Sequence, residues 1–379
     1  MSLRVAHVTS SSSFGGISRF VLEIGSLLQR TKDTKQIVIA FPEGGTVGPF
    51  LDKIEKAGLT ARCLQKDMPR LIAATFELIF LLKQHQIQIM CAHGYKARML
   101  GWFAAKWLGI PIIGVSHSAS GWSDGLRHRD KLYERLDRWM YRRMDHVACV
   151  SQAAADDVIR DGTPADRVSV IYNAICLDRF DGVPDFSYRH QLESMFPHKP
   201  KLIVGAAARL LPAKGFDILI TAAVQILKLG LDVGFVIFGE GPLREALQKQ
   251  IDNAGISSFV VMPGRTDQLD QYMPYFDLFA LSSHVEGLPT VLLEAMAART
   301  AIVATRVAGS TELMVEGSTG LMVPPNNPDA LAEAMQKVLN DNELRRTMGE
   351  NGRKRVEQHF TFEPQAEKYW ELFCRLVCK

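Results

Sequence analysis

Short apolar runs alternate with segments of helical periodicity along nearly the whole chain. In the first half, six such runs are rich in β-branched and aliphatic residues and predict strands at 5–9, 36–41, 87–92, 111–117, 146–151 and 168–172. Between them apolar residues recur every three or four positions, which predicts helices, for example over 17–30, 96–108 and 153–161. Strands that alternate with helices are typical of parallel sheets covered on both faces.

The alternation stops near residue 180 and then restarts. Residues 181–187 and 196–200 combine Gly, Pro and Asp and predict a linker. Six more strands are predicted at 202–208, 233–238, 259–262, 278–282, 301–304 and 320–323, and a last helix over 363–377. The sequence therefore predicts two doubly wound α/β domains, residues 1–180 and 196–360, facing each other across a cleft. A length of 379 residues suits two domains of ordinary size.

Composition places the chain among soluble globular enzymes, with 47% hydrophobic and 22% charged residues. Residues 3–8 read as a strand rather than a signal peptide. The longest apolar stretch, residues 71–82, contains Glu77 and is too short to span a bilayer. Six scattered cysteines without a Cys-x-x-Cys pattern are typical of reduced thiols. We therefore expect a cytoplasmic protein.

Basic residues are concentrated in residues 96–143. Four of them follow helical spacing (Lys131, Arg135, Arg138 and Arg142), and an opposite stripe is apolar (Leu132, Leu136, Trp139 and Met140). One interpretation is a solvated helix face with a core-facing side. The other is a patch for anionic lipid or a phosphorylated acceptor, which would place the protein at the inner face of the plasma membrane. We expect no nucleic-acid partner.

Two loops of the second domain have the residues of an anion site. Arg209 ends the first predicted strand there, and Lys214 opens the following helix, so both cations could bind a diphosphate. Glu286 follows the strand at 278–282, and Glu294 comes eight residues later. Because the carboxyl ends of parallel strands meet at one sheet edge, these groups should open together. The two carboxylates could then accept hydrogen bonds from sugar hydroxyls.

A helix that starts near Gly287 would place Glu294 two turns along, on the same side as Glu286. Its first amides would offer N–H groups to a phosphate.

Three further loops are weaker candidates. Gly15 and Gly16 lie between the first strand and helix, where a ligand could approach the backbone closely. His117 ends the strand at 111–117, and a polar loop follows it. Gly239 and Arg265 follow two strands of the second domain and could frame a flat base. Each also fits an ordinary explanation, namely a glycine-rich turn or a structural histidine.

Several motifs are missing from the sequence. It has no Asp-x-Asp at a strand end and no His/Cys cluster, so we expect no metal site. It has no Gly-x-Ser-x-Gly, which disfavours a covalent hydrolase. It also lacks Gly-x-Gly-x-x-Gly with a ribose-binding acid, which disfavours a NAD-dependent dehydrogenase.

At these residues the chain resembles the family 4 retaining glycosyltransferases of the GT-B fold, also described as glycosyl transferases group 1. The resemblance covers essentially the whole chain, because the landmarks occur in order: Gly15-Gly16, His117, Val150-Ser151, Val170-Ile-Tyr-Asn-Ala174, Arg209…Lys214-Gly215, Gly239-Glu-Gly241 and Glu286…Glu294. Tyr172 and Ala174 depart from the commoner Pro and Gly, and His284-Val285 stand where an aromatic residue is frequent.

The resemblance implies an enzyme that moves a hexose-type sugar from a UDP- or GDP-sugar to a saccharide or lipid-linked acceptor. It implies retention of the anomeric configuration, no metal or other cofactor, and a part in surface polysaccharide or glycolipid assembly. UDP is the commonest nucleotide in this family. A sugar-nucleotide epimerase of the same fold and a non-enzymatic two-lobed sugar-binding protein remain alternatives.

The resemblance also implies a role for each candidate residue. Arg209 and Lys214 would hold the diphosphate, assisted by the amides of Gly287 and Leu288. Glu286 would bind the donor sugar and Glu294 the ribose. The remaining implied contacts are of His117 with the sugar and of Gly16 with the phosphates.

The closing helix of this family crosses back onto the first domain. Here the segment 361–379 has an apolar face at helical spacing, made by Phe362, Ala366, Tyr369, Trp370 and Phe373. We therefore expect it to complete the N-terminal domain.

Overall fold

The computed structural model describes residues 2–9, 16–41, 48–66, 70–117 and 128–378. The chain divides into two compact units, one made of residues 1–174 with 362–379 and the other of residues 175–361. We refer to them as the N-terminal and the C-terminal unit.

The N-terminal unit is built on seven parallel strands in the order β3-β2-β1-β4-β5-β6-β7. The order reverses between β1 and β4, so this pair forms the switch point of the sheet. The strands are β1 (Leu3–Thr9), β2 (Thr34–Ala40), β3 (Thr60–Cys63), β4 (Ile89–His93), β5 (Ile112–Ser116), β6 (His146–Cys149) and β7 (Val168–Val170).

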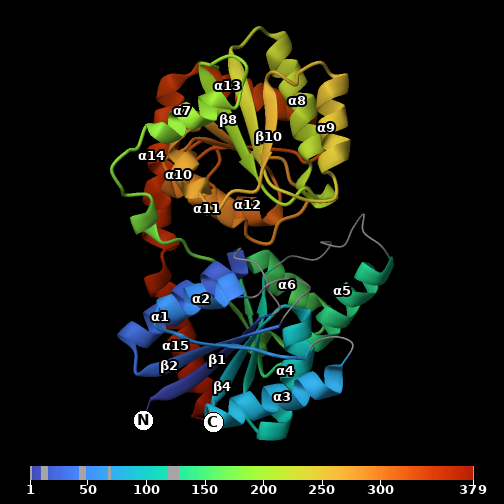
Figure 1. The fold of residues 1–379 in the computed structure, drawn as a ribbon, viewed down its shortest axis with the longest axis vertical. Coiled ribbons are helices and arrows are strands. Elements are labelled where there is room, and N and C mark those ends of the chain that lie inside the picture. The colour runs from blue at the N-terminus through green and yellow to red at the C-terminus, as the bar shows by residue number, and fades with distance from the viewer. Residues whose placement is uncertain (1, 10–15, 42–47, 67–69, 118–127, 379) are drawn as a thin grey trace. The chain divides into compact units, whose positions relative to one another are not determined.

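Helices cover both faces of this sheet (Figure 1). One face has α1 (Gly16–Thr31), α2 (Gly48–Lys56) and α15 (Phe362–Val377), and the other has α3 (Leu71–Gln84), α4 (Tyr95–Leu108), α5 (His128–Tyr141) and α6 (Gln152–Arg160). This division follows from right-handed crossovers, which change face when the chain reverses direction along the sheet. A short 3-10 turn, η1 (Ala165–Arg167), precedes β7.

The closing helix α15 belongs to the N-terminal unit. Tyr369 and Phe373 are fully buried, and the Tyr369 ring lies 5.8 Å from that of Phe20 on α1. Phe362, at the start of α15, contacts the same Phe20 ring. The prediction that the last helix returns to the first domain is confirmed.

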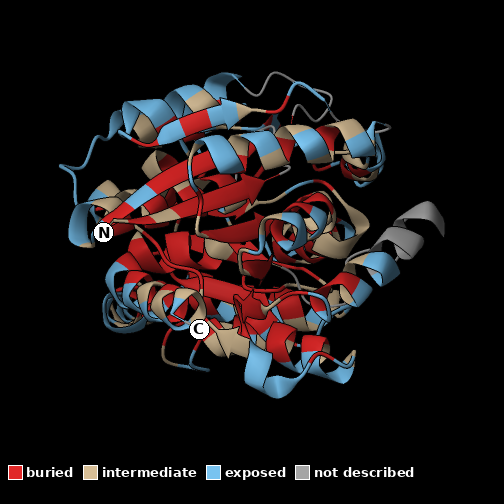
Figure 2. Cartoon of the chain, turned by 90° about the horizontal axis from the view of Figure 1, so that it is seen from below, coloured by how far each residue is buried: buried red, intermediate tan, exposed pale blue. Residues whose placement is uncertain are grey.

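The C-terminal unit has six parallel strands in the order β10-β9-β8-β11-β12-β13. They are β8 (Leu202–Ala207), β9 (Val233–Phe238), β10 (Val260–Gly264), β11 (Leu278–Leu281), β12 (Ile302–Thr305) and β13 (Leu321–Val323). Its switch point lies between β8 and β11. Most residues of these strands are buried, as expected for a parallel sheet with both faces covered. Most strand residues of the N-terminal unit are buried as well (Figure 2).

The helices of this unit are α7 (Ser187–Ser194), α8 (Phe216–Lys228), α9 (Arg244–Asn253), α10 (Leu269–Tyr272), α11 (Thr290–Ala297), α12 (Ala308–Leu313), α13 (Pro328–Asn340) and α14 (Asn342–His359). Three 3-10 turns accompany them, η2 (Leu177–Arg179), η3 (Pro212–Lys214) and η4 (Met273–Tyr275). Among the described helices, none combines the length and the hydropathy that a bilayer span requires.

The predicted fold class, two doubly wound parallel α/β domains, is confirmed, but three local predictions are wrong. The strand β3 was not predicted. The helix α11 begins at Thr290 instead of near Gly287, because Pro289 takes the N-cap position, so Glu294 lies only about one turn along it. On α5, Met140 is buried, but Leu136 and Trp139 are 47% and 44% exposed and do not face the core.

Candidate functional site

The loops that follow β8 and β11 are joined at the switch point of the C-terminal sheet. The amide of His284 donates to the carbonyl of Ala213 over 2.8 Å, and the Ser282 hydroxyl donates to the carbonyl of Lys214 over 3.0 Å. Gly215 has a positive φ of 59°, and a Cβ there would lie 2.2 Å from the Ser282 carbonyl oxygen. Glycine is therefore required at position 215 to bring the two loops together.

Lys214 and Glu286 form an ion pair across these loops. Nζ of Lys214 lies 2.7 Å from Oε1 of Glu286, and the Ser283 hydroxyl donates to the same oxygen over 2.7 Å. Both side chains are largely buried, at 23% and 10% exposure. The sequence predicts that the two residues share a sheet edge, and they do. It does not predict that they bind each other, so a ligand phosphate would compete with Glu286 for Lys214.

Arg209 is exposed two residues beyond β8, and its backbone is fixed by the neighbouring glycine loop. A Cβ at Gly239 would lie 1.9 Å from the carbonyl oxygen of Ala208, so only glycine allows this packing. The amide of Gly239 donates to the carbonyl of Gly264 over 2.9 Å and is therefore occupied. Arg265 is half-exposed and pairs with Asp267 at 3.0 Å. Gly239 therefore has a structural role, because its loop packs against the backbone next to Arg209.

Glu294 is buried on α11 at 7% exposure and faces a second arginine. Its Oε1 lies 4.0 Å from Nη1 of Arg179, and Arg179 also binds Asp270 at 2.7 Å. The sequence gives no signal for Arg179 or Asp270, because the first lies after the last predicted strand of the first domain and the second on a one-turn helix. The arginine restrains the carboxylate at the side of the site.

Gly287 and Leu288 lie buried in the loop before α11. A Cβ on Gly309 of α12 would lie 2.6 Å from the Gly287 carbonyl oxygen, so this loop is packed tightly against α12. Pro289 at the N-cap has no side-chain acceptor for the first amides of α11. Such amides are the groups that bind anions at helix N-termini.

In the N-terminal unit, His117 is the end of a chain of three hydrogen-bonded histidines. Nε2 of His117 lies 3.1 Å from Nδ1 of His93, Nε2 of His93 lies 3.1 Å from Nδ1 of His7, and Nε2 of His7 lies 3.1 Å from Oε1 of Gln36. His7 is on β1 and His93 ends β4, the two strands of the switch point. Phe20 covers the rings of His93 and His117.

Burial keeps these imidazoles neutral. Burial lowers the pKa of His7 to about 4, although the hydrogen bond that His7 donates to the Gln36 carbonyl oxygen acts to raise it. It lowers the pKa of His93 well below 6.5, and the charges of His117, His7 and Arg98 act in the same direction. Burial and the Arg98 charge lower the pKa of His117 to about 3. Three neutral rings have one N–H each.

Because each ring has a single N–H, the donor and the acceptor of each hydrogen bond between the three histidines are fixed. With the Gln36 carbonyl as acceptor, His7 donates from Nε2, His93 donates to His7, and His117 donates to His93. Nδ1 of His117 is left as a hydrogen-bond acceptor. Gln36, His7 and His93 were not predicted as site residues, since they are far apart in the sequence and meet only through the strand order.

The remaining predicted residues lie within segments that the structure does not describe, or next to them. Gly16 is the first residue of α1, at the carboxyl edge of β1. Gly15 and the polar loop 118–127 lie outside the described residues. Within the described part of the chain, no group of three or more His, Cys, Asp or Glu is placed to hold a metal ion. Metal independence stays a prediction.

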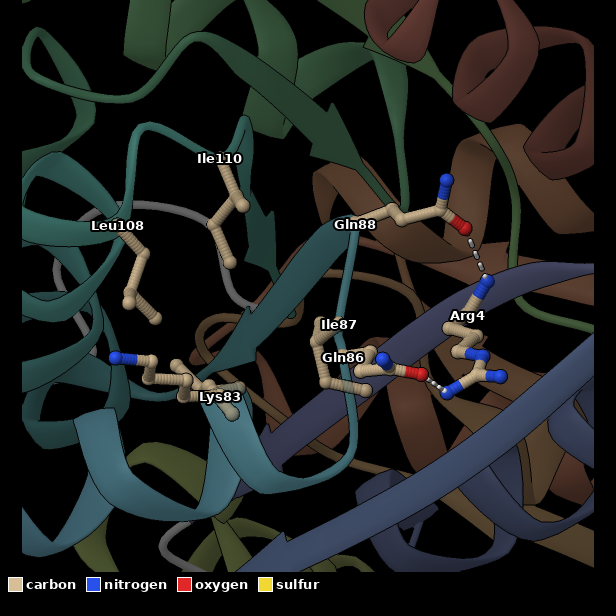
Figure 3. Close-up of a pocket in the computed structure, with 8 residues that line it drawn as sticks. Arg4, Lys83, Gln86, Ile87, Gln88, Leu108 and Ile110 are labelled. Atoms are coloured by element: carbon tan, nitrogen blue, oxygen red, sulfur yellow. Dashed lines mark hydrogen bonds between the residues drawn. The ribbon is translucent and has the colours of Figure 1, made fainter.

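A hollow of about 420 Å³ lies elsewhere in the N-terminal unit (Figure 3). Its lining includes Arg4, Lys83, Gln88 and Ile110, and the Arg4 guanidinium is bound to the Gln86 side chain. These residues stand where β1, β4 and β5 begin. Ligands of open α/β sheets bind at the opposite, carboxyl edge. We therefore do not assign the hollow to the candidate site of either unit.

Comparison with known families agrees with this architecture. Residues 14–179 match the model of "Glycosyltransferase Family 4", and residues 191–355 match that of "Glycosyl transferases group 1". The two matches cover most of each unit without overlapping. The chain belongs to the family 4, group 1 glycosyltransferases, and the protein is a glycosyltransferase.

Individual relatives extend over large parts of the chain. It is 29% identical over 279 residues to the alpha-D-kanosaminyltransferase of Streptomyces kanamyceticus, covering 70% of this chain and 71% of that protein. It is 24% identical over 388 residues to the Escherichia coli UDP-Gal:alpha-D-GlcNAc-diphosphoundecaprenol alpha-1,3-galactosyltransferase, covering 99% and 97%. The crystal structure of Anabaena HepE in complex with UDP and glucose superposes with a TM-score of 0.86 at 22% identity, covering 99% and 100%.

Proposed function

We propose that this glycosyltransferase moves a hexose-type sugar from a nucleotide-diphosphate donor to a saccharide or lipid-linked acceptor, with retention and without a metal ion. The observation on which this rests is the Lys214–Glu286 pair at the switch point between β8 and β11. It combines a cation for phosphate with a carboxylate for sugar hydroxyls at the edge where α/β sheets bind ligands.

The diphosphate would bind through Lys214 and Arg209. Lys214 would exchange its contact with Glu286 for a phosphate oxygen, and the exposed Arg209 would supply a bidentate partner. The amides at the start of α11, after Gly287 and Leu288, would add N–H donors. As the bond from the anomeric carbon to the phosphate oxygen breaks, these cations would stabilise the charge that grows on the diphosphate.

The two glutamates would orient the donor. Once Lys214 turns to phosphate, Glu286 keeps its hydrogen bond from Ser283 and can accept one from a sugar hydroxyl. Glu294, restrained by Arg179, would accept hydrogen bonds from the ribose hydroxyls. A fixed carboxylate needs little reorganisation when the ligand arrives.

His117 would contribute a hydrogen-bond acceptor rather than a charge. Its pKa of about 3 keeps the ring neutral at physiological pH, and Nδ1 would accept from a sugar hydroxyl. Retention would follow from attack by the acceptor hydroxyl on the face that the diphosphate leaves. The new bond joins the acceptor oxygen to the anomeric carbon, and the hydroxyl proton passes to the departing phosphate oxygen. A trapped covalent glycosyl-enzyme intermediate would contradict this route.

The relatives support a narrower version of the proposal. The Escherichia coli relative is named for UDP-Gal as donor and a diphosphoundecaprenol-linked acceptor, and HepE was crystallised with UDP and glucose. We therefore favour a UDP-sugar donor and a lipid-linked acceptor, in surface polysaccharide or glycolipid assembly. The enzyme would then work in the cytoplasm, peripherally at the inner face of the plasma membrane.

The proposal is tested by thermal shift with UDP, GDP, ADP and their sugar conjugates, before and after EDTA. We expect one nucleotide to raise the melting temperature, with EDTA making no difference. The same donor is then incubated with and without acceptors, and the anomeric configuration of the product is read by NMR. Sugar inversion at a ring carbon without an acceptor would indicate an epimerase, and donor binding without turnover would indicate a binding protein.

A further inference from the structure

The helices α3 and α4 leave an apolar surface open on the N-terminal unit. Ala74 and Leu78 of α3 are fully buried against the sheet, but on the opposite side of the same helix Ile72, Phe76 and Phe80 are 76%, 58% and 65% exposed. They stand four residues apart, so they form one row along the helix. The helix is therefore apolar on both sides, although only one side packs against the sheet.

The neighbouring helix α4 widens this row into a surface. Phe103 and Trp107, also four residues apart, are 54% and 72% exposed. The Phe76 and Trp107 rings meet edge to face with centroids 6.4 Å apart, and α3 and α4 lie side by side (Figure 1). Because large apolar side chains have about 150–250 Å² each, the five expose on the order of 500 Å². Soluble monomers rarely leave a larger apolar patch open.

Positive charges outnumber negative ones around this surface, although Nζ of Lys106 lies 3.6 Å from Oδ1 of Asp145 in an exposed ion pair. Lys83 at the end of α3 and Lys106 beside Trp107 are exposed, and the Arg143 guanidinium lies 4.4 Å from the Trp139 ring and 5.8 Å from that of Trp102. Within α3 and α4 the one acidic residue is Glu77. Its carboxylate accepts hydrogen bonds from the amides of residues 65 and 66.

This combination indicates what covers the surface. Phe and Trp side chains surrounded by Lys and Arg are typical of protein faces that lie in the interfacial layer of a bilayer with anionic lipids. A second copy of the chain is a poorer partner. A symmetric dimer through this face would bring Lys83, Lys106 and Arg143 close to the same residues of the other copy, and these like charges would repel each other.

We propose that the α3–α4 face, formed by Ile72, Phe76, Phe80, Phe103 and Trp107, docks the enzyme on an anionic lipid bilayer. The aromatic rings enter the headgroup and upper acyl region, and the flanking cations bind lipid headgroups. This inference deepens the proposed function by naming the surface for the peripheral contact. It extends the apolar part of that contact from the basic segment 96–143 to α3.

The test measures binding of the full chain to vesicles without any donor or acceptor. The chain is sedimented with vesicles of phosphatidylcholine alone and with one third phosphatidylglycerol. We expect selective binding to the anionic vesicles, and at least about tenfold weaker partitioning for the triple variant Phe76→Ser, Phe80→Ser, Trp107→Ser. Phe186→Ser is the matched control, because Phe186 is 66% exposed in the C-terminal unit and should leave binding unchanged.

Two further measurements separate the alternatives. The charge variant Lys83→Glu, Lys106→Glu should lose binding to anionic vesicles and keep its melting temperature, because both side chains are exposed. Donor binding by thermal shift should be the same in all variants, so loss of vesicle binding with intact donor binding separates docking from the proposed function. Equal vesicle binding by the triple variant, or a wild type that binds no vesicle, would overturn the inference. A concentration-dependent dimer that the triple substitution abolishes would also overturn it.

Discussion

The buried histidine chain predicts that the N-terminal unit loses stability in mild acid. In the unfolded chain His7 takes up a proton near its ordinary pKa of 6.5, but in the folded protein burial lowers this pKa to about 4. Between these values the unfolded state binds more protons, so the free energy of unfolding falls as pH decreases. The contribution of His7 to the free energy of unfolding is therefore fully present above pH 6.5 and is lost as the pH falls towards 4.

The magnitude follows from the same shift. Each tenfold change in proton affinity corresponds to about 1.4 kcal/mol, so His7 alone accounts for about 3 kcal/mol between pH 7 and pH 4. Its side chain is 1% exposed, so solvent screening does not reduce this figure. The pKa values of His93 and His117 are lowered in the same direction, and Arg98 adds to the effect on both.

The assay is urea unfolding at pH 7, 6, 5 and 4.5 at constant ionic strength, followed by tryptophan fluorescence. All five tryptophans belong to the N-terminal unit, so the signal reports this unit alone (Trp102, Trp107, Trp122, Trp139 and Trp370). His7→Gln keeps a hydrogen-bonding side chain but does not titrate. Carboxylates titrate alike in both proteins, so the difference between the two pH profiles isolates His7.

We expect His7→Gln to cost about 1–2 kcal/mol at pH 7, as other losses of a buried hydrogen bond do. As the pH falls towards 4, the free energy of unfolding of His7→Gln should decrease less than that of the wild type, by up to about 3 kcal/mol. His198→Gln, at a 38% exposed side chain in the C-terminal unit, is the control and should leave the profile unchanged. Identical pH profiles for the wild type and His7→Gln would refute the reasoning.

Three further predictions concern the switch point of the C-terminal unit. Lys214→Ala should lower kcat about 100-fold or more and also lower Tm, because Glu286 loses its cation in a largely buried pair, and exposed Lys249→Ala is its control; near-normal turnover would contradict the diphosphate role. Glu294→Ala should raise the Kd of the donor in calorimetry with a smaller effect on kcat, so an unchanged Kd would exclude the ribose role. Gly215→Ala should lower both Tm and donor affinity, because its Cβ would clash with the Ser282 carbonyl; retained donor affinity would show that the loops can separate without loss.

The sequence predicts the strands well where apolar residues form continuous runs. All six strands of the C-terminal unit lie within a few residues of their predicted positions, because a doubly covered parallel strand needs unbroken apolar residues. The missed strand β3 is the edge strand Thr60–Cys63, where a polar residue at each second position hides the pattern. Among the strands that the structure describes, it pairs with β2 alone, so it needs less apolar surface.

Side-chain partners are harder to predict than strands. The strand order at the switch point, which the fold class implies, brings Lys214 near Glu286. Their ion pair depends on the exact path of two loops, which no periodicity encodes. The histidine chain likewise requires that β1 and β4 be neighbours, with His7 and His93 on the same face of the sheet. On α5, helical periodicity identifies an apolar stripe but not whether the core reaches it, as exposed Leu136 and Trp139 demonstrate.

The return of α15 to the first unit has a consequence for how the protein is made. The ribosome must synthesise all of residues 175–361 before α15 can reach Phe20. At 5–20 residues per second this takes roughly 10 to 40 s. During this time the ring of Phe20 lacks the cover of Phe362 and Tyr369, so the nascent chain exposes an apolar face. The N-terminal unit, although translated first, is therefore the last to be completed.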